Sequence, residues 1–497
     1  MAEYKEQSLK QIISFRLEKL NKIKKMGINP FPYEFKISHF SNDVKKNFKK
    51  LENKEVIISG RIMSIRKMGK ASFFNIQDKN ENIQVYLKKD LIIKKEYELF
   101  ELLDIGDFVG IKGKVFKTKT KEISINCSEI KLLSKSIRPL HGNKEKNGEV
   151  FHGFTDKEQR YRHRYLDLIV NPDIKNDFTK RSKIISSIRN FLDANDFLEV
   201  ETPVLQPIYG GASAKPFKTK HNALNQNLFL RISDELYLKR LISGGFDSVY
   251  EISKVFRNEG MDKNHNPEFT MLEFYKANVD YFFLMDFVED LIRSVAKSIN
   301  VKKLEIANKN IDLDKPFLRY NYIDLLNNAV NEDLSSLKLD DLIALCKKFE
   351  IKLESKPTLG RVYDVLMREL VEPNLLEPTF ILNYPKIISP LAKISREGND
   401  NIVERFELFV GGNEIANAFS ELNDPIDQRI RFEEQMKFKK LGDDEAHNLD
   451  EDYLHSMEIG MPPTGGVGIG IDRLVMLLLN KTNIKDVILF PAMRFED

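Results

Sequence analysis

Hydrophobic residues recur along the chain with spacings that change from one stretch to the next. In residues 5–26 they fall on one helical stripe, which Gly27 and Pro30 end. Between residues 55 and 133 they form short alternating runs, which predict about five strands interrupted by a helical piece at 95–103. Helical spacing returns at 173–194, and strands and helices are mixed after that. The pattern predicts an α+β protein with a small barrel ahead of a larger domain.

The first helix carries a basic face opposite its apolar stripe of Leu9, Ile12, Ile13, Leu17, Leu20 and Ile23. The basic residues are Lys10, Arg16, Lys19, Lys22 and Lys24. Such a face is either solvated or in contact with an RNA backbone, and the sequence leaves both interpretations open.

Five strands in about 80 residues, with glycines at the bends, are typical of a Greek-key barrel of the OB type. These barrels bind single-stranded nucleic acid by stacking bases on aromatic rings. Phe73 and Phe74 are neighbours on one predicted strand, so only one of them can enter the core. The other can stack on a base, while Gln84 on the next strand can read a base edge by hydrogen bonding.

Length and composition narrow the class of protein. The 497 residues allow two to four domains, and 78 basic against 75 acidic residues give a net charge of +3. This balance argues against a basic coat for non-specific nucleic-acid binding, although a local basic face stays compatible with it. Two distant cysteines, Cys127 and Cys346, exclude a zinc ribbon and a disulfide framework. The start has no apolar signal-peptide core and no apolar run reaches 18 residues, so we expect a cytoplasmic protein with no membrane span.

Two strands joined by a polar loop are predicted between Tyr250 and Tyr275. If the first strand runs to Glu259, Arg257 and Glu259 point to one face. A cation and a carboxylate held there can bind a phosphate beside a hydroxyl, an amine or a metal ion. An exposed salt bridge is the alternative. The same hairpin also carries His265, Phe269, Glu273 and Tyr275, which favours a binding site.

Three carboxylates, Glu407, Glu414 and Glu421, follow at intervals of seven. Gly411 and Gly412 between the first two favour a strand–turn–strand, and the turn can return both carboxylates to one face. Acidic groups in such a place suit hard cations, which take oxygen ligands. A solvated acidic cluster is the alternative.

Glycines mark two further places where a ligand can approach the backbone. Gly210 and Gly211 precede Glu235, which stands where a strand meets a helix; capping of this helix by Asp234 or Glu235 is an equal alternative. Glycines 466, 468 and 470 alternate along a predicted strand and leave one face bare for a base or ribose. Arg473 opens the next helix. The stretch is no phosphate loop, because the Lys-Ser/Thr ending is missing.

The wording RNEG…HNPEFTMLEFY resembles motif 2 of the class II aminoacyl-tRNA synthetases, and most closely that of the class IIb lysyl-tRNA synthetases. The helix and strand ending at Pro203 resemble motif 1, and GIGIDR resembles motif 3. The resemblance implies a helical segment at 1–50, an OB anticodon-binding domain at 51–136, a linker at 137–170 and a catalytic domain at 171–497. Within the last, motif 1 spans about 178–203, motif 2 about 250–275 and motif 3 about 464–480, with a helical insertion at 279–400. It also implies a homodimer.

The activity implied is ATP-dependent activation of lysine, with Mg²⁺, and its transfer to tRNA(Lys). By resemblance, the catalytic residues are Arg257 and Arg473. The implied ATP-binding residues are Arg257, Glu259, His265, Asn266, Phe269, Glu407, Gly470 and Arg473, and the metal ligands are Glu407 and Glu414. The implied lysine-binding residues are Gly211, Glu235, Arg257, Glu273, Tyr275, Asn417, Phe419 and Glu421. Those for the anticodon are Phe73, Gln84 and Glu122.

The amino acid activated is also argued from the residues themselves. A long cationic substrate needs excess negative charge, because an unpaired buried ammonium is costly, and Glu235, Glu273 and Glu421 are available. The aspartyl and asparaginyl relatives typically show a glutamine in the stretch matching residues 234–236, which here is Asp-Glu-Leu.

Two rival functions remain. One is a lysyl ligase acting on a translation factor, a family that lacks the OB domain; the other is an RNA-binding protein on an inactive synthetase scaffold.

Overall fold

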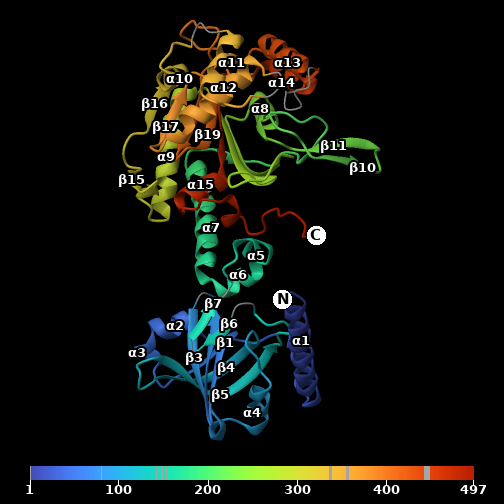
Figure 1. Cartoon of the computed structure of the whole chain (residues 1–497), viewed down its shortest axis with the longest axis vertical. Helices are drawn as coiled ribbons and strands as arrows, with labels where there is room; N and C mark the ends of the chain where they lie inside the picture. Colours follow the sequence, from blue (N-terminus) through green and yellow to red (C-terminus); the bar gives the residue numbers. More distant parts are fainter. Residues whose placement is uncertain are drawn as a thin grey trace. The chain divides into compact units, whose positions relative to one another are not determined.

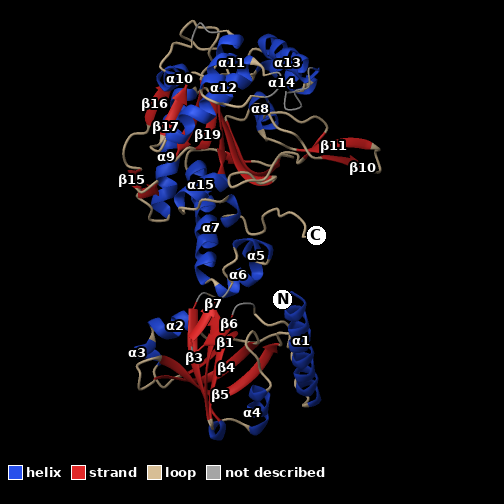
Figure 2. Cartoon of the chain, viewed as in Figure 1, coloured by secondary structure: helices blue, strands red, loops and turns tan. Residues whose placement is uncertain are grey.

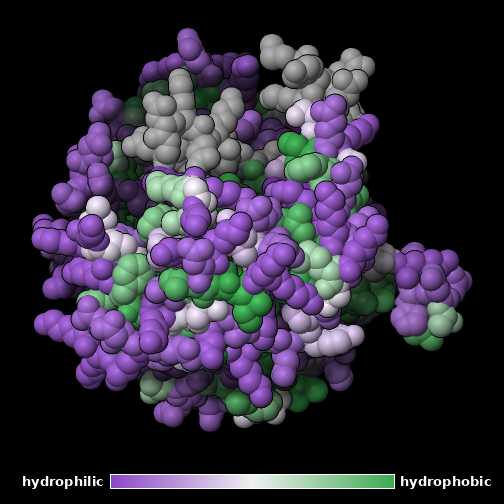
Figure 3. Space-filling model, turned by 90° about the horizontal axis from the view of Figure 1, so that it is seen from below, coloured by the Kyte–Doolittle hydropathy of each residue, from purple (hydrophilic) through white to green (hydrophobic). Residues whose placement is uncertain are grey.

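The computed structural model describes residues 2–79, 81–140, 143–146, 149–152, 154–334, 338–353, 357–440 and 448–496. It divides into two compact units, Met1–Lys175 and Asn176–Asp497. None of the helices within these described ranges is long and apolar enough to span a bilayer. On the face drawn in Figure 3, hydrophilic residues dominate and apolar residues occur in small scattered groups.

A closed five-stranded barrel forms the centre of the first unit, with strand order β1-β2-β3-β5-β4 (Figures 1 and 2). Its strands are β1 (Glu55–Met68), β2 (Ala71–Asp78), β3 (Glu81–Lys88), β4 (Phe108–Lys117) and β5 (Ile123–Ser134). The predicted helical piece is α4 (Lys94–Glu101), and short helices α2 (Ser41–Lys46) and α3 (Phe48–Leu51) precede the barrel. The OB-type barrel predicted from the alternating pattern is confirmed.

The first helix, α1 (Ala2–Lys25), uses part of its basic face inside the first unit. Arg16 is buried and donates to the backbone oxygens of Ile105 and Ser136, and Lys19 Nζ lies 2.6 Å from Asp104. Neither solvation nor RNA contact therefore accounts for these two cations. The helix is fixed to its neighbours by ion pairing as well as by apolar packing.

Residues 137–170, expected to be a linker, contain regular structure where they are described. Strands β6 (Asn143–Lys146) and β7 (Glu149–His152) pair with each other, and helices α5 (Lys157–Arg162) and α6 (Arg164–Val170) follow. Residues 141, 142, 147, 148 and 153 of this stretch lie outside the described residues. The predicted helix at 173–194 is α7 (Pro172–Asp193).

An eight-stranded, mainly antiparallel sheet organises the second unit, in the order β16-β17-β18-β19-β20-β13-β12-β8. Its strands are β8 (Leu198–Glu199), β12 (Ser248–Phe256), β13 (Glu268–Ala277), β16 (Leu318–Asn321), β17 (Thr379–Leu382), β18 (Arg405–Val410), β19 (Asn413–Ser420) and β20 (Thr464–Gly470). Buried residues of α7, α9 (Tyr281–Ser298) and α15 (Ile471–Leu478) share one apolar core with this sheet. These helices therefore support the sheet from one face.

Most of the remaining elements of this unit are labelled in Figure 1, and Leu304 and Ile311 of the β14–β15 pair belong to the same core as α7, α9 and α15. Strands β9 (Leu205–Gln206), β10 (Lys218–His221) and β11 (Gln226–Leu230) form a small separate sheet, and β14 (Lys303–Ile306) pairs with β15 (Lys309–Asp312). The helices are α8 (Glu235–Ser243), α10 (Tyr322–Val330), α11 (Leu339–Lys348), α12 (Leu359–Leu366), α13 (Pro425–Lys440) and α14 (Glu451–Gly460). The region 279–400, expected to be mostly helical, also supplies β16 and β17 to the main sheet; its residues 335–337 and 354–356 lie outside the described residues.

Two predicted strands are too long. The first strand of the central hairpin ends at Phe256, which pairs with Glu268, and not at Glu259. Arg257 N still donates to Pro267 O, its in-register partner across the hairpin, at 2.9 Å. The ladder ends there because Pro267 has no N–H to donate in return, and Asn258 N turns away to Lys215 O at 2.7 Å. The strand expected to end at Pro203 is reduced to Leu198–Glu199.

Candidate active site

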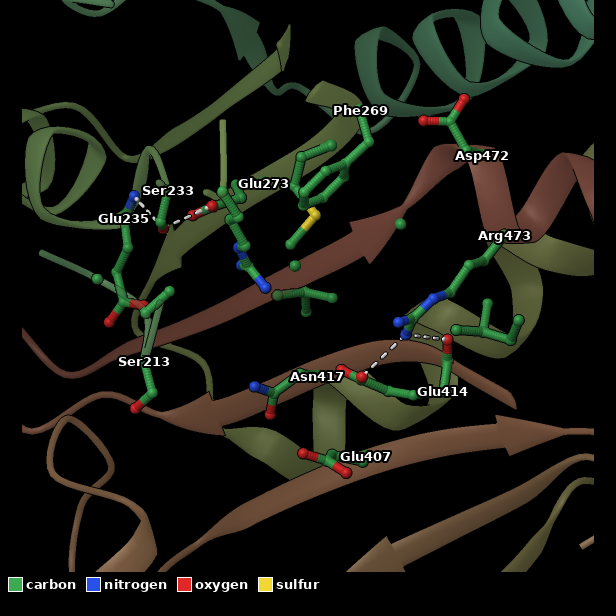
Figure 4. A pocket seen from close by; sticks show the side chains of 18 of the residues that line it. Ser213, Ser233, Glu235, Phe269, Glu273, Glu407, Glu414, Asn417, Asp472 and Arg473 are labelled. Atoms are coloured by element: carbon green, nitrogen blue, oxygen red, sulfur yellow. Dashed lines mark hydrogen bonds and ion pairs between the residues drawn. The ribbon is translucent and has the colours of Figure 1, made fainter. Parts of the chain in front are cut away.

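A cavity of about 390 Å³ lies on the sheet face formed by β13, β18, β19 and β20 (Figure 4). It brings together nearly all of the candidate residues of this unit. Those that line it are Gly211, Glu235, Arg257, Glu259, His265, Asn266, Phe269, Glu273, Tyr275, Glu407, Glu414, Asn417, Phe419, Gly470 and Arg473. Glu421 does not line it.

Strand β13 supplies one wall of the cavity through its alternation. Phe269, Met271, Glu273 and Tyr275 are two residues apart, so their side chains leave the same face of the sheet, and all four line the cavity. Neighbouring Leu272 and Phe274 point to the other face and are buried in the apolar core. One strand thus joins an aromatic ring, a carboxylate and a phenol in a single row.

The hairpin of β18 and β19 returns Glu407 and Glu414 to the same cavity. Its two-residue turn pairs Phe409 with Glu414, and Glu407 lies on the same face of β18 as Phe409. A register shift after Leu408 then places Asn417 opposite Glu407. Asn417 and Phe419 therefore face the cavity together with the two carboxylates.

The loop after β12 carries Arg257 and Glu259, so the argument that they share a strand face is wrong. Both nevertheless line the cavity. The Arg257 guanidinium carbon lies 5.2 Å from the centre of the Phe269 ring, and burial lowers the pKa of Arg257 although the carboxylates of Glu259 and Glu414 oppose this effect. A buried, always charged fork of this kind is suited to phosphate and carboxylate groups.

The opposite side of this loop brings His265 to the last helix. His265 Nε2 lies 3.1 Å from Arg473 Nη2, and its Nδ1 lies 2.8 Å from Asp262. Asn266 is buried: its amide donates to Glu268 O at 2.6 Å, and its oxygen accepts from Ala492 N at 3.2 Å. Asn266 therefore fixes the loop, and His265 presents its imidazole beside Arg473.

One end of the cavity is acidic and buried (Figure 4). Glu273 accepts hydrogen bonds from Ser233 Oγ at 2.7 Å, from Asp234 N at 3.0 Å and from Tyr275 OH at 3.0 Å. Burial, reinforced by the charge of Glu235, raises the pKa of Glu273 to about 7. These three donors hold the Glu273 carboxylate at the cavity, where its negative charge can face a cationic group that enters.

Glu235 and Glu421 share a buried ammonium. Lys239 Nζ lies 2.5 Å from Glu235 and makes an ion pair with Glu421 on its other side. The capping alternative for the helix is wrong for both side chains: Asp234 bonds to Ser253 and Arg231, whereas Glu235 turns to Lys239. Glu421 thus lies behind the cavity wall.

The glycines of β20 differ in what they allow. A Cβ on Gly466 would lie 2.1 Å from Glu421 Oε1 and 2.4 Å from Tyr275 Cε1, so only glycine lets these two side chains approach the strand. A Cβ on Gly468 would meet only the flexible end of Met271, at 3.1 Å, as its nearest neighbour. The face that was predicted to be bare is therefore occupied by Glu421 and Tyr275 at Gly466 and is more open at Gly468.

The other end of the cavity combines cations with carboxylates. Arg473 Nη1 lies 3.0 Å from Glu414 Oε2, and Arg405 Nη2 lies 2.6 Å from Glu407 Oε1. Burial raises the pKa of Glu407 to about 7, against the opposing effect of Arg405 and with a smaller contribution from Glu414. Two carboxylates that face one cavity fit Mg²⁺, which takes one or two protein carboxylates and completes its shell with other oxygen ligands. No group of three metal-ligating side chains is found among the described residues.

Three residues of the site were not recognised in the sequence. Ser233 links Glu235 to Glu273, because its Oγ donates to the latter and accepts from Glu235 N at 3.1 Å. Arg405 donates to Glu407 and, at 3.0 Å, to Asn417. Lys239 stands four residues after Glu235 on a helix, a spacing that signals an ion pair and that could have been noticed.

On the outer surface of the barrel, Phe73 is one of three aromatic rings in a row. Phe74 is 1% exposed and belongs to the core, whereas Phe73 packs on Tyr86 at 4.9 Å and Tyr86 lies 6.1 Å from Phe116. Gln84 is two positions from Tyr86 on the same face of β3 and accepts from Ser124 Oγ at 2.9 Å. Glu122 is exposed at the turn before β5. Tyr86 and Phe116 were not predicted, because they lie on other strands and are not adjacent to Phe73 in the sequence.

A barrel of the OB type and an antiparallel sheet carrying this cavity define a class II aminoacyl-tRNA synthetase. Family models agree: residues 156–494 match tRNA synthetases class II (D, K and N), and residues 56–133 match the OB-fold nucleic acid binding domain. The chain belongs to this family of class II synthetases.

Among its curated relatives, several are named lysine–tRNA ligase. The protein of that name from Thermoanaerobacter pseudethanolicus is 48% identical over 98% of this chain and 97% of its own length. The one from Carboxydothermus hydrogenoformans is 49% identical over 99% of both chains, and the one from Clostridium novyi is 48% identical over 99% of this chain and 96% of its own.

Proposed function

We propose that this protein is a lysine–tRNA ligase, which activates lysine with ATP and transfers it to tRNA(Lys). The observation that carries the proposal is the acidic end of the cavity, where Glu235 and Glu273 are buried a short way from the Arg257 guanidinium. A substrate bound there presents a carboxylate to the arginine and ammonium groups to the acids. Among amino acids this suits lysine, since aspartate or asparagine would place a carboxylate or an amide against buried carboxylates.

In the first reaction the carboxylate of lysine attacks the α-phosphate of ATP in line and pyrophosphate leaves, so that an adenylate forms. The enzyme contributes no nucleophile. Arg257 holds the substrate carboxylate and the α-phosphate together and stabilises the charge that builds up on the phosphate oxygens. In the second reaction a hydroxyl of the terminal adenosine of tRNA attacks the activated carbonyl and AMP leaves.

The rest of ATP occupies the opposite end of the cavity in this proposal. Phe269 stacks on adenine opposite the β20 glycines, of which Gly470 is the last, and Glu259 and Asn266 hold the ends of the loop around the nucleotide. His265 and Arg473, 3.1 Å apart, meet the β- and γ-phosphates. Glu407 and Glu414 would hold Mg²⁺, which would neutralise phosphate charge when bound.

The pocket contacts the α-amino group, the methylene stem and the ε-ammonium of lysine. Gly211 has a left-handed backbone with φ of +86° next to Ser233 and Glu235, which opens this corner to the α-amino group. Asn417 and Phe419 line the path of the methylene stem, and the ε-ammonium meets Glu273, Tyr275 and Glu421. The fully buried Glu421 acts from behind Gly466.

The barrel binds the anticodon, through stacking on Phe73 and hydrogen bonding by Gln84 and Glu122. In this proposal the anticodon-binding domain spans 51–136 and the catalytic domain 171–497. The protein forms a homodimer through motif 1 and works in the cytoplasm. A ligase acting on a translation factor is less well supported, because that family lacks a barrel such as the one at residues 56–133.

The test is amino-acid-dependent exchange of pyrophosphate into ATP, measured with each of the twenty amino acids in the absence of tRNA. Exchange with lysine alone supports the proposal. Exchange with aspartate or asparagine would move the chain to a sister enzyme, and the pocket assignment would be lost. No exchange with any amino acid would favour an RNA-binding protein on an inactive scaffold, although Arg257 and Arg473 are both present and face the cavity.

A further inference from the structure

A lysine side chain of the protein itself lies inside the wall of the proposed lysine pocket. Lys239 is completely buried on α8. Its ammonium bridges Glu235, which lines the cavity, and Glu421, which does not. It also lies 5.4 Å from the centre of the Phe419 ring, which lines the cavity as well. A buried ammonium costs folding free energy unless its neighbours compensate it, so its retention at this place calls for an explanation.

The geometry of Glu421 gives the explanation. One oxygen, Oε2, is taken by Lys239, while the other, Oε1, lies against the backbone of Gly466 in the cavity wall. Within the described residues neither Glu421 oxygen makes a hydrogen bond of ordinary geometry, and Oε1, unlike Oε2, has no ion pair either, although Glu421 is 1% exposed. An orphaned buried carboxylate oxygen at the wall of a cavity is poised to accept from a donor that enters the cavity.

The charges at this end also balance in a specific way. Glu235, Glu273 and Glu421 carry three negative charges when ionised, and Lys239 cancels one of them. The remaining two match the α- and ε-ammonium groups of a bound lysine, whose own carboxylate is met by Arg257. Without the resident ammonium the same pocket would hold an uncompensated buried carboxylate.

We infer that Lys239 is a positioning residue for amino-acid binding: it clamps Glu235 and Glu421 on either side of the pocket wall and leaves a charge that only a doubly cationic substrate neutralises. This inference rests on the proposed function. Lys239 acts on the substrate through the carboxylates of Glu235 and Glu421. Lys239 is not a catalytic residue, because it does not line the cavity.

The groups that face the Lys239 ammonium determine its effect on pH dependence. They are Glu235 on its own helix, Glu421 after β19 and Tyr453 on α14, with Glu273 and Tyr275 of β13 acting through the two acids and Arg405 of β18 acting on Glu235. Burial alone would lower the pKa of Lys239, but Glu235 and Glu421 hold it above its usual value, so the residue stays charged. Removing this charge raises the pKa of both acids, because they lose their counter-ion in a buried place.

The experiment is lysine-dependent pyrophosphate exchange by the full chain, with KM for lysine and for ATP measured between pH 6 and pH 9. For Lys239→Met we expect KM for lysine to rise by about 30-fold while KM for ATP stays within about 3-fold, because only the amino-acid end is disturbed. The pH at which KM for lysine falls to its plateau should also move upward by about one unit. A merely structural role would change both KM values or neither, without moving this pH. Lys254→Met, at an exposed lysine of β12, is the matched control.

A double-mutant cycle keeps the inference testable if the single variant is unstable. Glu421→Gln removes the other partner of this ion pair, and only the double variant Lys239→Met/Glu421→Gln leaves neither charge at the two positions. If Lys239 acts through Glu421, the double variant binds lysine no worse than the weaker of the two single variants. Multiplicative losses, or wild-type KM values for lysine in Lys239→Met, would overturn the inference. If the wild type showed no lysine-dependent exchange, the proposed function itself would be lost instead.

Discussion

The two ends of the cavity handle charge in opposite ways. At the amino-acid end, Glu235 and Glu273 are buried and their positions are fixed. Glu273 accepts from Ser233 Oγ, from Asp234 N and from Tyr275 of its own strand, and Glu235 accepts from Lys239 of its own helix. At the phosphate end, Arg473 and Glu414 pair with each other while their side chains remain 25% and 39% exposed. The buried end is suited to choosing a substrate, because a wrong charge there stays unpaired. The open end is suited to the phosphates of the proposed ATP, which stay the same whichever amino acid is activated.

Arg257 lies between the two ends, so its removal should have the largest effect. We expect Arg257→Ala to lower the rate of pyrophosphate exchange by about 100- to 1000-fold, or about 3–4 kcal/mol, since it removes a contact to the charge developing on phosphate. Arg319→Ala, at an exposed arginine paired with Asp286, is the control and should stay within about 2-fold. A loss below about 5-fold for Arg257→Ala, roughly 1 kcal/mol, would contradict the role of Arg257.

A substitution at one end of the cavity should change KM for one substrate and leave KM for the other nearly unchanged. Glu273→Gln should raise KM for lysine by about 30- to 100-fold, because it removes one partner of a buried charge pair, and leave KM for ATP within about 2-fold. Arg473→Ala should do the reverse. Steady-state exchange kinetics with each substrate varied in turn measure both values. Equal shifts of both KM values in either variant would show that the ends are not independent.

The β20 glycines provide a finer comparison. Gly466→Ala places a methyl group against Glu421 and Tyr275, and should lower the free energy of unfolding by about 1–3 kcal/mol and raise KM for lysine. Gly468→Ala approaches the flexible end of Met271 at 3.1 Å, while Glu273 and Asn417 stay at an ordinary contact distance of 3.9 Å. We therefore expect a loss of stability below about 1 kcal/mol and a smaller rise in KM for lysine than for Gly466→Ala. Urea unfolding and exchange kinetics of the two variants test this. Indistinguishable variants would mean that the two glycines are equally crowded.

The smallest effect should come from outside the cavity. Phe73→Ala should leave pyrophosphate exchange unchanged and raise KM for tRNA in the charging reaction by about 10-fold, because one stacked base loses its partner. Tyr33→Ala, at a fully exposed ring of the same unit, is the control. Any change in lysine-dependent exchange for Phe73→Ala would mean that the barrel affects activation.

The sequence predicts the ordered parts of this architecture better than its buried contacts. The alternation at Phe73 and Phe74 predicts that only one of the two rings enters the core, and the structure shows that it is Phe74. Phe269, Glu273 and Tyr275 were expected at one site because they share a hairpin, and the two-residue period of β13 places them in one row. The end of β12 could not be predicted from local spacing, since it depends on Pro267 facing Arg257 across the hairpin and on the bond from Asn258 N to the distant Lys215 O. The same holds for Glu421 and Lys239. No local spacing in the sequence indicates that Glu235 and Glu421, which are 186 residues apart, both pair with the ammonium of Lys239.

Calorimetric titration of lysine near pH 7, in buffers of different ionisation enthalpy, tests the central claim most directly. Burial raises the pKa of Glu273 to about 7, so the carboxyl is partly protonated there, and an ammonium beside it lowers this pKa again. Binding should therefore release about half a proton or more at pH 7 and clearly less at pH 9, and Glu273→Gln should reduce the release. Binding of lysine with no proton release, or with proton uptake, at pH 7 would contradict the claim that this buried carboxylate receives the substrate's charge.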